Sequence, residues 1–350
     1  MDIPTLSLVW FILIGVLWTG YLVLEGFDFG VGMLLRPLGR TDTERRVIIN
    51  TIGPVWDGNE VWLLVAGGAT FAAFPEWYAT MFSGFYLPLL VILTALIIRG
   101  VAFEYRGKIN DPAWRARWDW AVTIGSWIPA VLWGVAFANL IRGVDLTPEH
   151  EMVSSFWSLL NPFALLGGAV TALVFLTHGA IFLALKTEGE MRARTGKLAA
   201  RLAVPAVVAA GIWALWAQLA YSSHTLTWIP VLVAAIALVA TVFLTARRSE
   251  GWAFFSTTVA IAAVVIFIFG ALFPNVMPAL TPENSLTIAN ASSTPYTLKI
   301  MTWVAVVLMP FVLGYQAWTY WVFRKRLRVE DIPAGGGLPK VEPADLHPKN

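Results

Sequence analysis

The residues of this chain best suited to chemistry are acids embedded in apolar sequence. Asp57 and Glu60 lie at the start of one long apolar segment, and the preceding segment carries Glu25 and Asp28. Ionisable groups at membrane depth are costly and usually functional. Carboxylates that cluster in a low-dielectric site cannot all be ionised, so some of them are expected to hold protons near neutral pH and to pass them on. The pattern therefore predicts a buried site for proton transfer.

The surrounding composition is typical of a protein that crosses a membrane many times. Apolar residues make up 58% of the 350 residues and charged residues only 13%, whereas a soluble domain carries about 25% charged residues. The 18 tryptophans and 21 phenylalanines fit aromatic belts at two membrane interfaces. The chain has no cysteine, which excludes disulfides and thiolate metal sites. Metal binding and nucleic-acid binding are not expected.

Nine apolar stretches are long enough to cross a bilayer as helices. They cover roughly 6–34, 50–73, 79–103, 119–141, 157–185, 201–222, 228–246, 253–273 and 299–323. Nearly all of the 24 Lys and Arg residues fall in the loops of one side, which predicts that this side is cytoplasmic. We therefore predict an all-α polytopic membrane protein with nine transmembrane helices, the N-terminus outside and the C-terminus cytoplasmic.

A weak internal repeat predicts how these helices group. Segment 24–27, a basic loop and the second span are echoed by segment 177–180, another basic loop and the sixth span. We predict a first four-helix bundle at 1–141 that carries the acids and a second, scaffold bundle at 142–273. An outer loop with a peripheral ninth helix at 274–328 and a disordered cytoplasmic tail at 329–350 complete the chain.

The two acidic segments are predicted to meet at equal depth. Glu25 and Asp57 each lie about 11 residues from the basic end of their span, which is about 16 Å along a helix. Gly26 and Gly30 form a small-xxx-small pair that lets helix backbones approach closely. These two antiparallel helices are therefore expected to bring their carboxylates together within the membrane.

The third span adds two charged residues to this site. Arg99 lies within the span, and Glu104 follows near its basic end. Glu104 at the mouth, with Asp57 and Glu25 deeper and Glu60 on the same face as Asp57, would make an inward-facing proton path. Arg99 can instead neutralise one of the acids and hold a polar pocket in shape.

A purely structural interpretation stays open for several of these residues. The acids can form structural ion pairs between helices, and Asp28 can simply pair with Arg99. Trp56 and Trp62 are more often packing residues than elements of a quinone or gas path. His178 is the sole interior ionisable group of spans five to nine. A six-coordinate haem needs a second axial ligand, and no second histidine lies within a span, so haem ligation by this chain is not expected.

Several motifs resemble subunit II of the cytochrome bd quinol oxidase family. They are Glu-Gly-Phe-Asp-Phe-Gly-Val-Gly-Met-Leu at 25–34, Asp-Thr-Glu-Arg-Arg at 42–46, Trp-Asp-Gly-Asn-Glu-Val-Trp at 56–62, and further segments at 82–86, 103–106, 118–120 and 134–139. Together they cover most of the first half of the chain. The second half resembles the family in its number of spans and in little else.

The resemblance implies a haem-free subunit in a respiratory terminal oxidase of the bacterial cell membrane. Its partner, a homologous subunit I, would carry the quinol site, two b haems and one d haem. The electrogenic complex would oxidise quinol and reduce O2 to water in aerobic respiration, with protons taken from the cytoplasm. A small accessory subunit is a further expected partner.

The resemblance also implies roles for single residues. Family members use acids that match Glu25 and Asp57 for proton delivery. An oxygen channel lies near the position of Trp62 in some members. Some members also hold a structural quinone, menaquinone or ubiquinone, near three positions: Trp56, Asp28 and Arg99.

One interpretation from another class of protein competes with this one. A stand-alone proton-coupled secondary transporter would also combine an internal repeat with polar groups at mid-membrane. Against it, spans five to nine contain no Asp or Glu, so the second half offers no polar groups to complete an alternating-access site. Co-purification with a haem-bearing partner would distinguish the oxidase subunit from the transporter.

Overall fold

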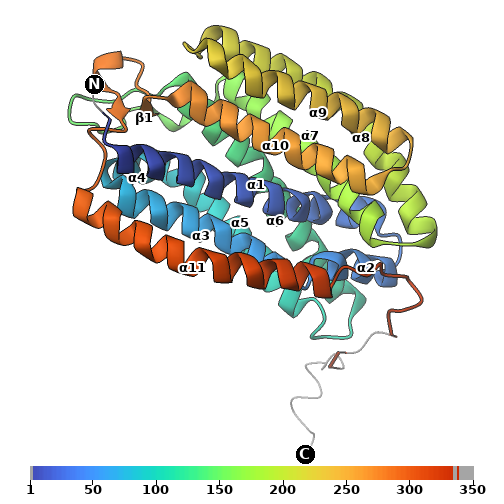
Figure 1. Ribbon diagram of the computed structural model, residues 1–350. Helices are drawn as coiled ribbons and strands as arrows, with labels where there is room; N and C mark the ends of the chain where they lie inside the picture. Colours follow the sequence, from blue (N-terminus) through green and yellow to red (C-terminus); the bar gives the residue numbers. More distant parts are fainter. Residues whose placement is uncertain (1–2, 334–336, 339–350) are drawn as a thin grey trace, which may run out of the picture.

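The computed structural model describes residues 3–333 and 337–338. Long helices that run side by side make up nearly all of it (Figure 1). The α-helices are α1 (Thr5–Leu38), α2 (Asp42–Ile52), α3 (Trp56–Ala73), α4 (Pro75–Gly84), α5 (Tyr86–Tyr105), α6 (Pro112–Arg142), α7 (Pro162–Lys186), α8 (Gly189–Ala220), α9 (Trp228–Ala246), α10 (Glu250–Leu272) and α11 (Pro295–Val322). Two short strands, β1 (Asn275–Met277) and β2 (Leu286–Thr287), pair in the loop before α11.

Within the described residues, eight helices are long and apolar enough to cross a membrane: α1, α5, α6, α7, α8, α9, α10 and α11. The predicted nine spans exceed this number by one, because α3 does not qualify. Its first five residues include Asp57, Asn59 and Glu60, which shorten its apolar run, although it lies against α1. The predicted third span is divided between α4 and α5, which meet at Phe85.

Several of the long helices begin with a shared local signal. A capping side chain accepts a hydrogen bond from the backbone of the first turn, and a proline follows it at the first helical position. The pairs are Asp111–Pro112 at α6, Asn161–Pro162 at α7 and Thr294–Pro295 at α11. These starts are readable from the sequence. Those of α6 and α11 lie a few residues before the predicted apolar stretches, whereas that of α7 lies five residues inside the stretch predicted at 157–185.

Helix α1 is the centre of the molecule and contacts α2, α3, α6, α7, α10 and α11. It crosses α7 so closely that only glycine fits at the crossing point. A Cβ atom on Gly30 would lie 2.0 Å from the carbonyl oxygen of Phe175, and one on Gly179 would lie 2.5 Å from the carbonyl carbon of Gly30. The predicted close approach at Gly26 and Gly30 therefore exists, and its partner is α7.

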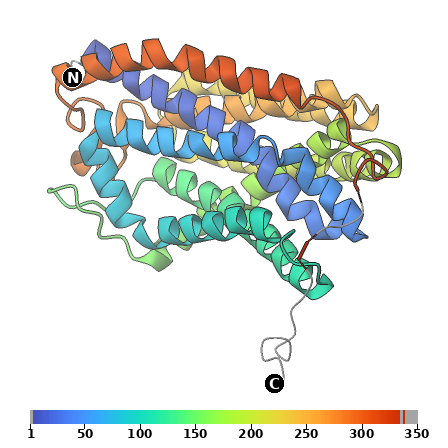
Figure 2. The same ribbon diagram turned by 90° about the horizontal axis from the view of Figure 1, so that it is seen from below.

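The other helices surround α1 in two groups. Helices α7, α8, α9 and α10 contact one another in succession, and α10 returns to α7. On the other side, α3 and α6 contact α1, while α5 contacts α6. Helix α11 runs along the outside, against α1 and α3 (Figures 1 and 2). The division into bundles at 1–141 and 142–273, with 274–328 apart, stays a prediction, because α1 packs against helices on both sides of residue 142.

The two ends of the helix bundle differ in their loops. The loops after α1, α5, α7, α9 and α11 lie at one end, which we call the basic end because Lys and Arg concentrate there. Its location on the cytoplasmic side stays a prediction. Of the predicted disordered tail at 329–350, residues 334–336 and 339–350 lie outside the described residues, whereas 329–333 begin with a turn that joins Ile332 N to Val329 O.

Candidate functional site

Glu25 and Arg99 form an ion pair in the interior of the helix bundle. Both side chains are fully buried, and the shortest distance, from Arg99 Nη1 to Glu25 Oε1, is 2.5 Å. The rings of Phe29 and Phe103 lie 4.9 and 5.3 Å from the guanidinium carbon. Arg99 thus neutralises an acid of α1, which was one of its two predicted roles.

Asp28 is also fully buried, but its partner is an amide. Asn59 Nδ2 on α3 donates a hydrogen bond of 2.6 Å to Asp28 Oδ2. The two acidic segments therefore meet as predicted, and the direct contact joins Asp28 to Asn59. The structure pairs Arg99 with Glu25, so the expected pairing of Arg99 with Asp28 is replaced by this amide contact.

Two residues of α11 complete the surroundings of Asn59. Tyr320 donates its hydroxyl to Asn59 Oδ1 at 2.6 Å, and Gln316 Nε2 lies 3.4 Å from the same oxygen. The indole of Trp62 donates to Gln316 Oε1 at 2.9 Å. Sequence reasoning missed the α11 pair, because the ninth span has no acid. The available signal was their spacing of four residues, which places two polar side chains on one face of an apolar helix.

Asp57, Glu60 and Glu104 lie outside this buried group. Asp57 and Glu104 are exposed on the isolated chain, and Glu60 is partly buried. Among the described residues they make no hydrogen bond or ion pair. Glu104 acts electrostatically on Asp57, and Glu60 experiences the charges of Glu25 and Asp57. Asp57 therefore does not meet Glu25 directly, and Glu60 interacts electrostatically with both of them.

Both tryptophans at the start of α3 pack against neighbouring helices. The ring of Trp56 lies 5.1 Å from that of Phe103 on α5. The ring of Trp62 lies over Gly20 of α1, where a Cβ atom would come within 2.2 Å of it. These contacts fix the rotation of α3 about its axis, and they agree with the packing interpretation.

His178 on α7 has a partner at each ring nitrogen. Nδ1 lies 2.6 Å from Thr257 Oγ1 and Nε2 lies 3.2 Å from the carbonyl oxygen of Val23. Its ring stacks on Phe254 at 4.5 Å. Nor do the described residues contain a group of three His, Cys, Asp or Glu side chains that could hold a metal ion. The residues around His178 therefore do not fit haem ligation.

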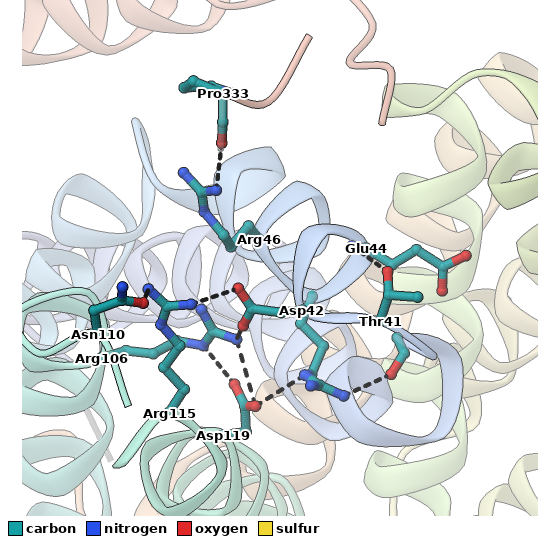
Figure 3. A network of polar contacts seen from close by, with 11 residues as sticks. Thr41, Asp42, Glu44, Arg46, Arg106, Asn110, Arg115, Asp119 and Pro333 are labelled. Carbon is teal, nitrogen blue, oxygen red and sulfur yellow. Dashed lines mark hydrogen bonds and ion pairs between the residues drawn. The ribbon is translucent and has the colours of Figure 1, made fainter. Parts of the chain in front are cut away.

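At the basic end, five charged residues form a network that ties α2, α5 and α6 together (Figure 3). The fully buried Asp119 accepts a hydrogen bond from Arg106 Nε at 2.5 Å and forms an ion pair with Arg45, whose Nε lies 3.0 Å from Asp119 Oδ2. Asp42 pairs with Arg106 at 2.7 Å and with Arg115 at 3.1 Å. Burial lowers the pKa of Arg106, but the hydrogen bonds and charges of both aspartates outweigh this and raise it above its ordinary value.

This network explains why the motifs at 42–46, 103–106 and 118–120 occur together. Each motif contributes one or two members of the network, and the sequence had assigned no role to any of these members. The network fixes the start of α2, which leads into Asp57, and the end of α5, which carries Glu104. It therefore positions the outer acids relative to each other.

A sequence profile described as cytochrome bd terminal oxidase subunit II matches residues 6–323. The chain belongs to this family. The matched region includes every residue of the buried acidic site and of the network at the basic end. Membership in this family and the eight apolar helices identify a multi-pass protein of the bacterial cell membrane and a component of a respiratory oxidoreductase.

Curated relatives support the same family over nearly the whole length. The chain is 45% identical over 326 residues to the cytochrome bd ubiquinol oxidase subunit 2 of Bacillus subtilis, with 91% of this chain and 96% of that protein covered. It is 41% identical over 370 residues to the cytochrome bd-I ubiquinol oxidase subunit 2 of Escherichia coli K12, with 95% and 98% covered.

A solved structure shares the fold. A chain of the bd oxidase from Geobacillus thermodenitrificans superimposes with a TM-score of 0.73 at 18% identity, covering 91% of this chain and 99% of that one. At this identity, the similarity is evidence for the arrangement of helices alone.

Proposed function

We propose that this chain is the haem-free subunit II of a bd-type quinol:O2 oxidoreductase and that it delivers protons toward a haem-bearing subunit I. The observation that carries the proposal is a row of four acids that starts on the surface and ends in the bundle. Glu104 and Asp57 are exposed, Glu60 is partly buried, and Glu25 is fully buried. Two b haems and the d haem would belong to the partner, because both ring nitrogens of His178, the one histidine within an apolar helix of the described chain, already have partners.

Each acid has a distinct part in this path. Glu104 collects protons at the basic end, which would be the cytoplasmic side, and Asp57 and Glu60 pass them inward. Glu25 is the inner acceptor, and Arg99 holds its carboxylate in place. Asp28 Oδ1 and Arg99 Nε are buried and lack a hydrogen-bond partner among the described residues. Buried polar atoms of this kind are usually satisfied by ordered water, which would connect acids that do not touch.

The same acids indicate which face meets the partner. Asp57 and Glu104 are exposed on α3 and α5, and the same two helices expose apolar side chains such as Leu64, Leu93 and Ile97. A carboxylate within an apolar span that faces lipid is costly. We therefore propose that subunit I covers the α3–α5 face, so that the path opens into the interface between the two subunits.

Two further features of the family belong to the proposal. A structural menaquinone or ubiquinone would bind near Trp56, Asp28 and Arg99, where the unpartnered Arg99 Nε could donate a hydrogen bond to one of its carbonyl groups, as could Asp28 Oδ1 when it carries a proton. An oxygen path would start near Trp62, because an apolar cavity of about 470 Å³ lies one turn further along α3, beside Leu63 and Gly67. A small accessory subunit stays a prediction.

The experiment that tests the proton path uses the purified oxidase complex. Asp57→Asn and Glu25→Gln should each leave the haem absorbance unchanged and slow quinol-driven O2 consumption at least tenfold. Glu283→Gln, which changes an exposed acid in the loop before α11, is the matched control and should retain the wild-type rate. Normal turnover in both site variants would exclude the path.

The transporter alternative receives no support from the site. The acids and their partners come from α1, α3, α5 and α11, and the helices α7 to α10 contribute no carboxylate within their apolar stretches. The comparisons favour the oxidase subunit throughout.

A further inference from the structure

A ligand-sized cavity of about 490 Å³ opens at the basic end between α10 and α11. Its floor is formed by α1 and α7, and Figure 1 shows α10 and α11 on either side of α1. The volume lies within the range of about 300–1,000 Å³ that is usual for small-molecule sites. No residue in the proposed proton path lines this cavity.

The inner wall of the cavity is aromatic. The rings of Phe27 and Phe182 stack with their centres 4.1 Å apart, and Phe254 lies 5.8 Å from each of them. Tyr320 also lines the cavity, but its hydroxyl is bound to Asn59. This interior therefore suits a hydrocarbon chain and has little to offer a polar ligand.

The mouth of the cavity carries three cations: Lys186, Arg324 and Arg326. Lys186 Nζ donates to the carbonyl oxygens of Phe323 and Lys325, and Arg326 Nη1 donates to that of Thr187 at 3.2 Å. These bonds hold the segment after α11 against the end of α7. The cations are thus fixed in place by backbone groups that carry no net charge.

No carboxylate neutralises this mouth directly. Within the described part of the chain, none of the three cations forms an ion pair. Glu250 is within electrostatic range of Arg326, but its carboxylate is already paired with Arg192 at 2.9 and 3.0 Å. The mouth therefore keeps a net positive charge at the level where a helix bundle meets the membrane surface.

We propose that this cavity binds an anionic glycerophospholipid, with its phosphate on Lys186, Arg324 and Arg326 and one acyl chain between the phenylalanine rings. Basic pockets at the ends of transmembrane helices attract acidic headgroups, and the aromatic interior requires an apolar tail. A quinone would leave the cations without an anion, and a soluble phosphate would leave the aromatic interior unused. The bound lipid would bridge α10 and α11, which both line the cavity.

The test is native mass spectrometry of the delipidated oxidase complex titrated with phosphatidylglycerol or with phosphatidylcholine of the same acyl chains. The wild type should bind one phosphatidylglycerol at least tenfold more tightly than phosphatidylcholine. Replacing all three cations by glutamine should weaken this binding tenfold or more. The matched control Lys197→Gln/Arg201→Gln/Arg247→Gln removes three basic residues of α8 and the α9–α10 loop that do not line the cavity, and it should bind as the wild type does.

A second variant guards against a local folding defect in the first. Thr258→Trp keeps every cation and fills the cavity, so it should also lose the tightly bound phosphatidylglycerol. The proposal is overturned if the wild type binds the two lipids equally, or if Thr258→Trp retains the lipid. It is also overturned if the purified complex carries a quinone that phosphatidylglycerol cannot displace and that Thr258→Trp removes.

Discussion

The buried ion pair between Glu25 and Arg99 permits a quantitative test of the inner site. Both side chains are fully buried and their closest atoms are 2.5 Å apart. Removing one member of such a pair leaves an uncompensated charge in a low-dielectric interior, which costs about 3–5 kcal/mol. Arg99→Gln should therefore lower the free energy of unfolding by about that amount. This corresponds to an unfolding equilibrium constant that is larger by roughly two to three and a half powers of ten.

The double variant separates the ion pair from the individual side chains. Glu25→Gln/Arg99→Gln removes both charges, so it should be clearly more stable than the sum of the two single changes predicts, with a coupling of about 0.5–3 kcal/mol or more. Tryptophan fluorescence during denaturation of the purified complex measures stability, and O2 consumption measures function. The double variant should regain stability but not turnover, since the inner acceptor is gone.

A control variant and a contrary result complete this test. Arg142→Gln changes a basic residue at the C-terminal end of α6, away from the basic end of the bundle. It should have little effect on either stability or O2 consumption. The reasoning fails if Arg99→Gln unfolds at the same denaturant concentration as the wild type, or if the two single effects simply add. Either result would mean that water already screens this pair within the bundle.

Three further predictions concern the framework around the site. Gly30→Ala should destabilise the chain by about 1–3 kcal/mol in the same denaturation assay, because its Cβ atom would meet the backbone of α7; an unchanged midpoint would contradict the crossing geometry. Asp119→Asn should lower the free energy of unfolding by about 1.5–3 kcal/mol for each charge-assisted hydrogen bond that it loses. Asp145→Asn, which changes an exposed acid, should leave this free energy unchanged. Equal stability of the two variants would exclude a role for the network at the basic end. For Glu44, burial raises the pKa, but the backbone N–H of Arg40 and the guanidinium of Arg194 outweigh this effect and lower the pKa below its ordinary value. The ionised carboxylate therefore stabilises the folded chain fully above the ordinary pKa of about 4.3. This stabilisation is lost as the pH falls through the lowered pKa. The melting temperatures of the wild type and Glu44→Gln should accordingly converge on acidification, and a constant difference would contradict this linkage.

The positions of the helices could be predicted from the sequence because long apolar runs leave few alternatives. Helix α3 was the exception, since the acids that mark it as functional also reduce its hydropathy. The same physical conflict appears at functional sites generally, where a local rule is broken for the sake of chemistry.

The contacts of the acids could not be predicted in the same way. The depth of a side chain follows from counting residues, but the direction in which it points depends on the rotation of the helix about its axis. Positions i and i+2, such as Asp57 and Asn59, point in directions roughly 200° apart. Packing of Trp62 against Gly20 turns Asn59 toward α1 and leaves Asp57 on the outer face. Counting alone had placed Asp57 opposite Glu25.

The contribution of α11 was beyond sequence reasoning for a different reason. Tyr320 and Gln316 reach Asn59 across more than 250 residues of chain, and no local pattern says which helix the last span will meet. The network at the basic end was easier to anticipate from the sequence. Its members Asp42, Arg106 and Asp119 all belong to the motifs at 42–46, 103–106 and 118–120 that resemble the family. Their partners still required the structure.

The crossing of α1 and α7 limits the kind of motion that this molecule can perform. At Gly30 and Gly179 the two backbones touch without an intervening side chain, so neither helix can tilt or slide without a main-chain collision. A carrier that exposes its site first to one side and then to the other needs freedom of this sort between its halves. A chain locked at its centre is better suited to moving hydrogen ions between fixed groups, where only side chains and solvent have to rearrange.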